Sequence, residues 1–452
     1  MKKNNFYQLF NTKGLLLIIL LAFIIRMIFF IALQPWENEV INKTILVKDA
    51  AGYHQLALSL LSKKSFEDFD TFRTPGYPLF VAMIYAISSC KIWLVLFLQI
   101  IMNIASLLLL YKIASAIFSR NIALLSAFLF AIDPLQIIYS VQLLTDTLFV
   151  FLFLVSTYYL CNGIIRKNYT FLIISALALG LATLVRPISY LFPLVIIIFI
   201  FLFSNITVKL KLLYSVVFTV IFIAAISPWL YHNYSKYGEV NLSSISGYNL
   251  LFYNVASTES YKTGMPIEEV RNKFDKLALQ RGYDTTELNP YKNSRIFSNI
   301  AGEYIRDNFI LYCKRQLMGV VYLYCASPSG VIASNFHQES RYDGTGKYSA
   351  NFRYLNMFMS MSLAEIVITI SIFLFLLINY LYSLYGIYLS AKLKNKYVFL
   401  LIFIILYFTI LTGAVGGSRY RLPFMPFINI LCAAGILYLY SKIKDKFRSV
   451  KK

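Results

Sequence analysis

Long apolar runs recur along this chain, and most are close to the length that crosses a lipid bilayer. They begin near residues 14, 92, 122, 143, 169, 188, 212, 364, 397 and 422. A helix needs about 20 apolar residues to cross the roughly 30 Å of hydrocarbon in a membrane. The pattern therefore predicts an all-α, polytopic membrane protein with a bundle of about ten transmembrane helices.

A shorter apolar run covers Tyr77–Ser89 and opens with the sequence Pro-Gly-Tyr-Pro at residues 75–78. At about 13 residues it is short for a membrane span, and the distribution of basic residues decides whether it crosses. If it does not cross, most lysines and arginines of the short connections fall on one side, together with both termini. The short connections on the other side then hold only Lys91, Arg186, Arg419 and Arg421. The positive-inside rule thus predicts cytoplasmic termini and a segment at 77–89 that does not cross.

This topology divides the chain into three parts. Residues 1–231 form a membrane module whose first outer loop covers about 35–91, and 232–363 form a large external loop. Residues 364–452 add the last transmembrane helices and a basic cytoplasmic tail. Within the external loop, Pro266 and Gly282 bracket an amphipathic pattern that predicts a helix, whereas 327–354 read as a flexible loop.

The composition supports a membrane protein and gives the high net charge a topological cause. Hydrophobic residues make up 59% of the 452 residues and charged residues only 14%, although the formal net charge is +21. A soluble domain has roughly 25% charged residues. Because the excess of basic residues follows the cytoplasmic side of the predicted spans, nucleic-acid binding is not needed to explain it. The predicted location is the cytoplasmic (inner) membrane.

Several polar motifs lie on the predicted outer side, in a fixed order along the chain. The first outer loop holds Lys48-Asp49-Ala50-Ala51-Gly52-Tyr53-His54 and then Phe72-Arg73-Thr74-Pro75-Gly76-Tyr77-Pro78. Further along come Asp133-Pro134, Thr145-Asp146-Thr147, Val185-Arg186-Pro187, Ser227-Pro228-Trp229 and Arg419-Tyr420-Arg421-Leu422-Pro423.

In this order the motifs resemble membrane glycosyltransferases of the GT-C fold, specifically the group similar to protein O-mannosyltransferases and aminoarabinose (lipid A) transferases. The resemblance spans most of the chain but not the loop 239–363. It implies a GT-C-like bundle with interfacial helices in the first outer loop and a partly helical late outer loop. It also implies transfer of a single sugar from a polyprenyl-phosphate donor to a lipid, glycan or protein acceptor on the outer face of the membrane.

The chemistry of such a transfer indicates which residues to examine. A phosphate is a good leaving group, so one base for the acceptor's proton and positive charge for the departing phosphate suffice. Asp49, where the resembled family has an acidic residue, is the predicted base in an inverting single displacement. A second acid, Asp146, is expected to position the acceptor or a divalent cation.

The predicted phosphate-binding residues are four arginines on the outer side, because a guanidinium binds phosphate through two parallel hydrogen bonds. They are Arg73, Arg186, Arg419 and Arg421. Four neighbouring side chains are candidates for substrate binding: Tyr53, His54, Tyr77 and Tyr420.

No cofactor is indicated with certainty, and a divalent cation stays open. The only histidines, His54, His232 and His337, show no zinc-site spacing. Two other classes of protein remain as alternatives. An O-antigen polymerase or ligase has a similar outline, but would not be expected to carry Asp49 and the Arg73 motif together. A transporter or flippase is a more distant alternative, because no repeated halves are evident.

Overall fold

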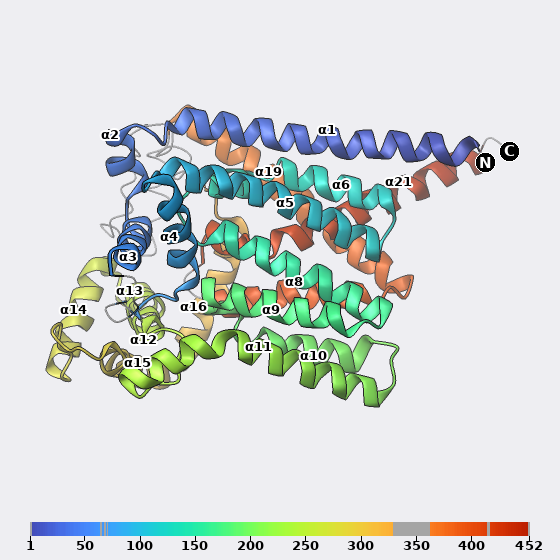
Figure 1. Ribbon diagram of the computed structural model, residues 1–452. Coiled ribbons are helices and arrows are strands. Elements are labelled where there is room, and N and C mark those ends of the chain that lie inside the picture. Colours follow the sequence, from blue (N-terminus) through green and yellow to red (C-terminus); the bar gives the residue numbers. More distant parts are fainter. Residues whose placement is uncertain are drawn as a thin grey trace.

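The protein is an elongated helical bundle with a group of shorter helices at one end. The computed structural model describes residues 2–63, 66, 69, 71–328, 362–413 and 416–450, and the regular elements in these ranges are helices. Both termini lie at one end of the bundle, and the shorter helices α12 to α15 lie at the other (Figure 1). The structure therefore agrees with termini that share one side of a membrane.

The bundle contains eleven α-helices, counted over the described residues, and two short 3₁₀ turns. They are α1 (Lys2–Leu33), α5 (Ile92–Ile117), α6 (Arg120–Ala131), α7 (Pro134–Ser140), α8 (Asp146–Arg166), α9 (Tyr169–Val185), η2 (Pro187–Ser189), α10 (Phe192–Phe203), α11 (Val208–Tyr237), α19 (Leu363–Lys392), α20 (Tyr397–Thr412), η5 (Ser418–Arg421) and α21 (Met425–Val450).

Six helices of the described chain are long and apolar enough to cross a membrane, or seven if the bent pair α6 and α7 counts as one span. The predicted count of ten spans is not confirmed. Three of the expected spans correspond to shorter apolar helices, at Tyr169–Val185, Pro187–Phe203 and Tyr397–Thr412. At 1.5 Å per residue, a helix of 16 or 17 residues reaches only about 25 Å.

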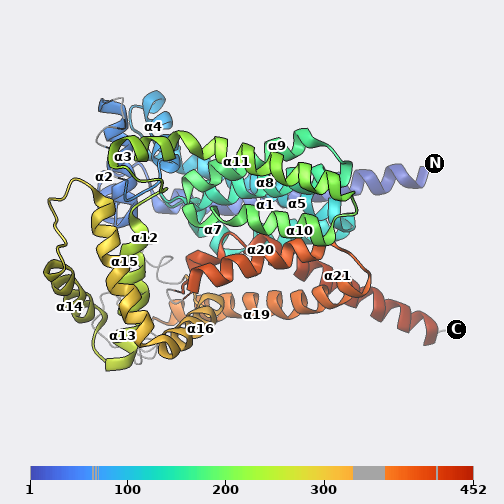
Figure 2. The ribbon, with the colours of Figure 1, turned by 90° about the horizontal axis from the view of Figure 1, so that it is seen from below.

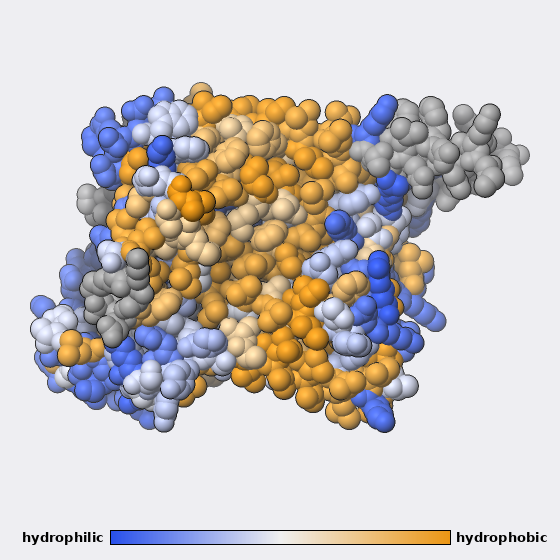
Figure 3. Space-filling model, in the orientation of Figure 1, coloured by the Kyte–Doolittle hydropathy of each residue, from blue (hydrophilic) through white to orange (hydrophobic). Residues whose placement is uncertain are grey.

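The surface of the bundle has the character of a membrane protein. Figure 3 shows a broad apolar region across the middle of one face, with hydrophilic residues gathered at both ends. Exposed leucines and isoleucines of α1 and α11, such as Leu17 and Ile223, contribute large apolar side chains to the outside of the bundle. Because lipid is as apolar as these side chains, their exposure costs little in a membrane.

The helices outside the bundle come from two loops. They are α2 (Asn38–Val40), the π-helix η1 (Ile41–Ile45), α3 (Asp49–Lys63), α4 (Gly76–Ser88), α12 (Ile245–Tyr248), the π-helix η3 (Asn249–Val255), α13 (Ala256–Thr263), α14 (Ile267–Gln280), α15 (Pro290–Asp307) and α16 (Phe309–Cys325). The helix predicted between Pro266 and Gly282 is confirmed as α14. The loop predicted at 327–354 lies outside the described residues except for 327 and 328. Seen from below, α14 and α15 extend beyond the bundle, whereas α16 returns along it toward α19 (Figure 2).

The bend between α6 and α7 is held by a buried arginine of α1. The two helices meet at 55°. Arg26 of α1 is fully buried and donates hydrogen bonds to the carbonyl of Ala131 at 3.0 Å and to Asn103 Oδ1 at 2.7 Å. On the other side of the bend, Asp133 Oδ1 accepts from the N–H of Leu135 and caps α7. Backbone groups that a bend frees inside a bilayer must find such partners.

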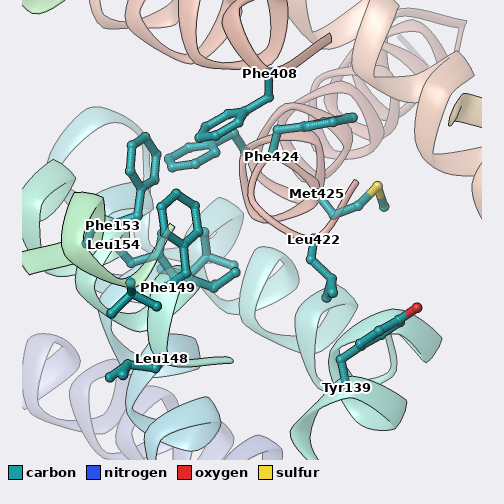
Figure 4. Close-up of a cluster of buried hydrophobic side chains, with 14 of the residues drawn as sticks. Tyr139, Leu148, Phe149, Phe153, Leu154, Phe408, Leu422, Phe424 and Met425 are labelled. Carbon is teal, nitrogen blue, oxygen red and sulfur yellow. The ribbon is translucent and has the colours of Figure 1, made fainter. Parts of the chain in front are cut away.

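The bend and the core below it fix the segments that carry the polar motifs. Gln136 of α7 donates to the carbonyl of Leu422, directly after η5, at 3.3 Å. Beside this contact, Phe149 and Phe153 of α8 pack against Phe408 of α20, with ring centroids 6.1 and 5.2 Å apart, and Figure 4 shows this cluster. The start of α8 and the turn η5 are therefore anchored side by side.

Candidate active site

Five charged residues from five separate segments form one chain of ion pairs. Arg73 Nη2 donates to Asp49 Oδ1 at 3.0 Å, and Arg419 Nη1 donates to Asp49 Oδ2 at 2.9 Å. Arg419 Nε donates to Asp146 Oδ2 at 2.8 Å, and Arg186 Nη1 donates to Asp146 Oδ1. The structure thus brings together both predicted acids and three of the four predicted arginines.

Local structure explains why these side chains meet. Asp49 and Asp146 are the first residues of α3 and α8, where the helix dipole favours a negative charge. Arg186 follows the last residue of α9, and Arg419 lies in η5. Helix ends of the bundle lie at one level, so residues far apart in sequence reach a common point.

The two carboxylates differ in their exposure to solvent. The Asp146 side chain is 0% exposed, and each of its oxygens accepts from an arginine. The Asp49 side chain is 44% exposed. Burial works against ionisation of Asp49, but Arg419 and Arg73 outweigh it and hold the pKa of this carboxyl below its ordinary value. Of the two acids, Asp49 is the one that a substrate can reach.

Arg421 does not join this chain of ion pairs. Its guanidinium is fully buried and donates to the carbonyls of Leu323, Tyr324 and Ala326 at the C-terminal end of α16. These contacts satisfy carbonyls that a helix end leaves without partners. The predicted phosphate-binding role of Arg421 therefore finds no support in its position, and its contacts indicate a helix cap.

The four candidate substrate-binding side chains have different surroundings. The Tyr53 ring lies under the Arg73 guanidinium at 4.4 Å, and the Tyr420 ring lies 6.0 Å from that of Arg186. Tyr77 is buried and donates to Gln99. His54 contacts the hydroxyl of Tyr85 instead, and neither His54 nor Tyr77 lines the cavity beside the ion pairs.

A cavity of about 760 Å³ opens beside the ion pairs. Asp49, Arg73, Arg186 and Arg419 form one wall, and they are its only charged residues in the described chain. Apolar residues at the ends of bundle helices, including Ile188, Leu230 and Leu411, form a second wall. The third wall is uncharged, with mostly polar and some apolar side chains, and comes from residues 240–254 of the external loop.

Sequence reasoning missed this third wall. Tyr248, Asn249, Tyr253 and Asn254 line it from α12 and η3. Their spacing of five residues does not match the α-helical period, so the periodicity of the sequence carries no signal for them.

The site offers hydrogen-bond donors to a phosphate more readily than it offers ligands to a metal ion. Among the described residues, no three His, Cys, Asp or Glu side chains come together as a metal site. The oxygens of Asp49 and Asp146 accept from guanidinium groups. The predicted role of Asp146 in positioning an acceptor or a cation stays a prediction, while its contacts show that it holds Arg186 and Arg419.

Comparison with known proteins confirms the predicted resemblance. Residues 73–232 match the family described as dolichyl-phosphate-mannose-protein mannosyltransferase. This segment contains Arg73, Asp146 and Arg186 of the ion-pair chain. No curated protein sequence matches the chain.

Solved structures are similar to this chain at low sequence identity, and the one with a TM-score above 0.5 shares its fold. The archaeal oligosaccharyltransferase AglB from Archaeoglobus fulgidus, in complex with an inhibitory peptide and a dolichol-phosphate, matches with a TM-score of 0.56 and 15% identity over 99% of this chain and 52% of that chain. ArnT from Cupriavidus metallidurans bound to undecaprenyl phosphate matches with a TM-score of 0.44 and 11% identity over 94% of this chain and 78% of that chain. This chain spans about half the length of AglB.

Proposed function

Because residues 73–232 match a family of glycosyltransferases that use lipid-phosphate-linked sugars, we propose that this protein moves a single sugar from a polyprenyl phosphate to a lipid, glycan or protein acceptor. The observation that carries the proposal is the chain of ion pairs beside the 760 Å³ cavity. Three arginines are fixed in place by two aspartates, and one of those aspartates is open to the cavity. The transfer takes place on the outer face of the cytoplasmic membrane.

The net charge of the site fits a donor with one phosphate. Three guanidinium groups and two carboxylates leave a single positive charge. A sugar joined to a lipid through one phosphate is a phosphodiester with one negative charge, so the two charges cancel. A diphosphate-linked sugar would bring a second negative charge that the cluster does not balance, and an unpaired charge in a partly apolar cavity is costly.

The proposed reaction is a single displacement at the anomeric carbon. The acceptor's hydroxyl or amine attacks this carbon, the bond from the carbon to the phosphate oxygen breaks, and the polyprenyl phosphate leaves with the electron pair. Asp49 takes the acceptor's proton, and the anomeric configuration inverts. Arginines positioned in advance stabilise the charge that develops on the phosphate.

The resting ion pairs couple donor binding to activation of the base. Asp49 accepts from Arg73 and Arg419, which hold its pKa below the ordinary value. A donor phosphate that draws Arg73 or Arg419 toward itself frees an oxygen of Asp49 and raises the pKa of this carboxyl. The base thus becomes available when the donor is in place.

The orientation can be tested by labelling. We propose ten crossings, with α9, α10 and α20 added to the longer spans, and cytoplasmic termini. In a variant without native cysteines, an impermeant thiol reagent added outside the cell should modify a cysteine placed at Glu269 and leave cysteines at Lys112 and Lys394 unmodified. All three positions are exposed in the structure. Labelling at Lys112 from outside would contradict the proposed orientation.

The transfer itself can be tested by mass spectrometry of the cell envelope. A deletion strain of the source organism should lose one glycosylated species from its lipids, glycans or proteins. In its place the strain should contain a species that is lighter by a single sugar. Wild-type protein should restore the lost species. Loss of long polymers with every single-sugar decoration retained would instead favour a polymerase or ligase.

A further inference from the structure

The uncharged wall of the cavity owes its arrangement to a π-helical turn. In a π-helix the hydrogen bonds run from residue i to i+5, so residues five apart come to lie near one another on one face. Two such pairs occur around η3: Tyr248 with Tyr253, and Asn249 with Asn254. The two tyrosine rings are 6.1 Å apart, and Asn254 Nδ2 donates to the carbonyl of Asn249 at 3.5 Å. All four side chains line the cavity.

Neighbouring side chains hold this wall in place. The Tyr248 ring packs edge-on against Phe72, next to Arg73 of the ion-pair chain, with centroids 5.5 Å apart. Arg271 of α14 lies over the Tyr253 ring at 4.9 Å, and its Nε donates to the carbonyl of Phe252 at 3.0 Å. The wall is thus fixed to the charged cluster on one side and to the external helices on the other.

We propose that Tyr248, Asn249, Tyr253 and Asn254 form a glycosyl subsite that selects an uncharged sugar. This inference rests on the proposed function, because the sugar reaches the wall only when its phosphate lies at the arginines. Amide groups donate to and accept from sugar hydroxyls, and aromatic faces offer an apolar surface to the C–H groups of the ring.

Charge is the feature that makes the subsite selective. The cavity's charged residues in the described chain belong to the cluster whose single positive charge the donor phosphate cancels. Among the described residues, a cationic amino sugar would find no carboxylate on this wall. Behind the wall, Arg271 and Glu268 form an ion pair with each other at 2.9 Å, so Glu268 is not free to balance the cation. An anionic sugar would bring a second negative charge that nothing in the cluster balances. Specificity of this kind comes from leaving the wrong charge unpaired.

The test compares donors that differ only in the charge of the sugar. Undecaprenyl phosphate mannose and undecaprenyl phosphate 4-amino-4-deoxy-arabinose are titrated into purified protein in nanodiscs. We expect the neutral donor to bind at least about tenfold more tightly. In Asn249→Asp and Asn254→Asp, the new carboxylate should shift this ratio toward the amino sugar by about tenfold. Asn299→Asp, on exposed α15 and away from the cavity, is the matched control and should leave the ratio unchanged.

The outcomes distinguish this inference from the proposed function. Equal or tighter binding of the amino-sugar donor to the wild-type protein would overturn the subsite, as would an unchanged ratio in both aspartate variants whose thermal melting is normal. Undecaprenyl phosphate without a sugar serves as the third probe. If it binds but the sugar's charge has no effect, only the subsite is wrong. If none of the three probes binds, the donor site itself is wrong.

Discussion

Sugar transfer should fall by roughly 10²–10⁴-fold when Asp49 is replaced by Asn, the range that loss of a general base produces. Asparagine keeps the size of the side chain and one oxygen that can accept a hydrogen bond, but it cannot take the acceptor's proton. Donor binding should persist, because Arg73, Arg186 and Arg419 all remain. The measurement is turnover of a radiolabelled polyprenyl-phosphate sugar by purified protein, with donor binding measured separately.

Asp275→Asn provides the matched control for this result. Asp275 lies on the exposed side of α14, and its side chain is outside the cavity. Its replacement should leave turnover unchanged. Near-normal transfer by Asp49→Asn would remove Asp49 as the base, and a product with retained anomeric configuration would contradict the single displacement.

The second large effect is expected at Arg419, the residue that bridges the two aspartates. In Arg419→Ala, the donor concentration needed for half-maximal transfer should rise by about one to two orders of magnitude, since a charge-assisted hydrogen bond contributes roughly 1.5–3 kcal/mol. Lysine should rescue only in part, because its ammonium cannot reproduce the two-pronged geometry with which Arg419 contacts Asp49 and Asp146. The measurement is the dependence of initial transfer rate on donor concentration.

Arg421 supplies a contrast two residues away. Its hydrogen bonds go to carbonyls at the end of α16, so Arg421→Ala should lower the melting temperature. The folded protein should still need the same donor concentration for half-maximal transfer. An unaltered donor dependence in a folded Arg419→Ala variant would exclude Arg419 from phosphate binding. An altered one in folded Arg421→Ala would restore the role predicted from the sequence.

The sequence allowed the all-helical membrane fold and most members of the candidate site to be predicted, because both depend on positions along the chain. Arg186 and Arg419 drew attention as basic residues on the side that is poor in them, and Asp49 through its place in the first outer loop. Their convergence requires only that helix ends meet at one level. The pairing of Asp146 with two arginines is a long-range contact, and no local pattern encodes it.

Other features could not be predicted, for physical reasons that differ from case to case. Arg419 and Arg421 look equivalent in sequence, but they lie on different sides of the 3₁₀ turn η5. Arg419 therefore contacts Asp146, whereas Arg421 contacts the carbonyl of Ala326. Arg26 meets carbonyls that are free only because α6 and α7 bend. The face formed by Tyr248 and Tyr253 depends on a wide helical turn whose period differs from that of an α-helix.

The aspartates of the ion-pair chain also compete with soluble anions for the guanidinium groups of the arginines. Because Asp49 and Asp146 are part of the same molecule as the arginines, their effective concentration at the guanidinium groups is on the order of millimolar or above. A small soluble anion must displace them with its own charge alone. A polyprenyl phosphate adds the binding energy of its hydrocarbon chain. If the proposed function is correct, we therefore expect the site to bind ligands that arrive through the lipid in preference to free sugar phosphates from the aqueous phase.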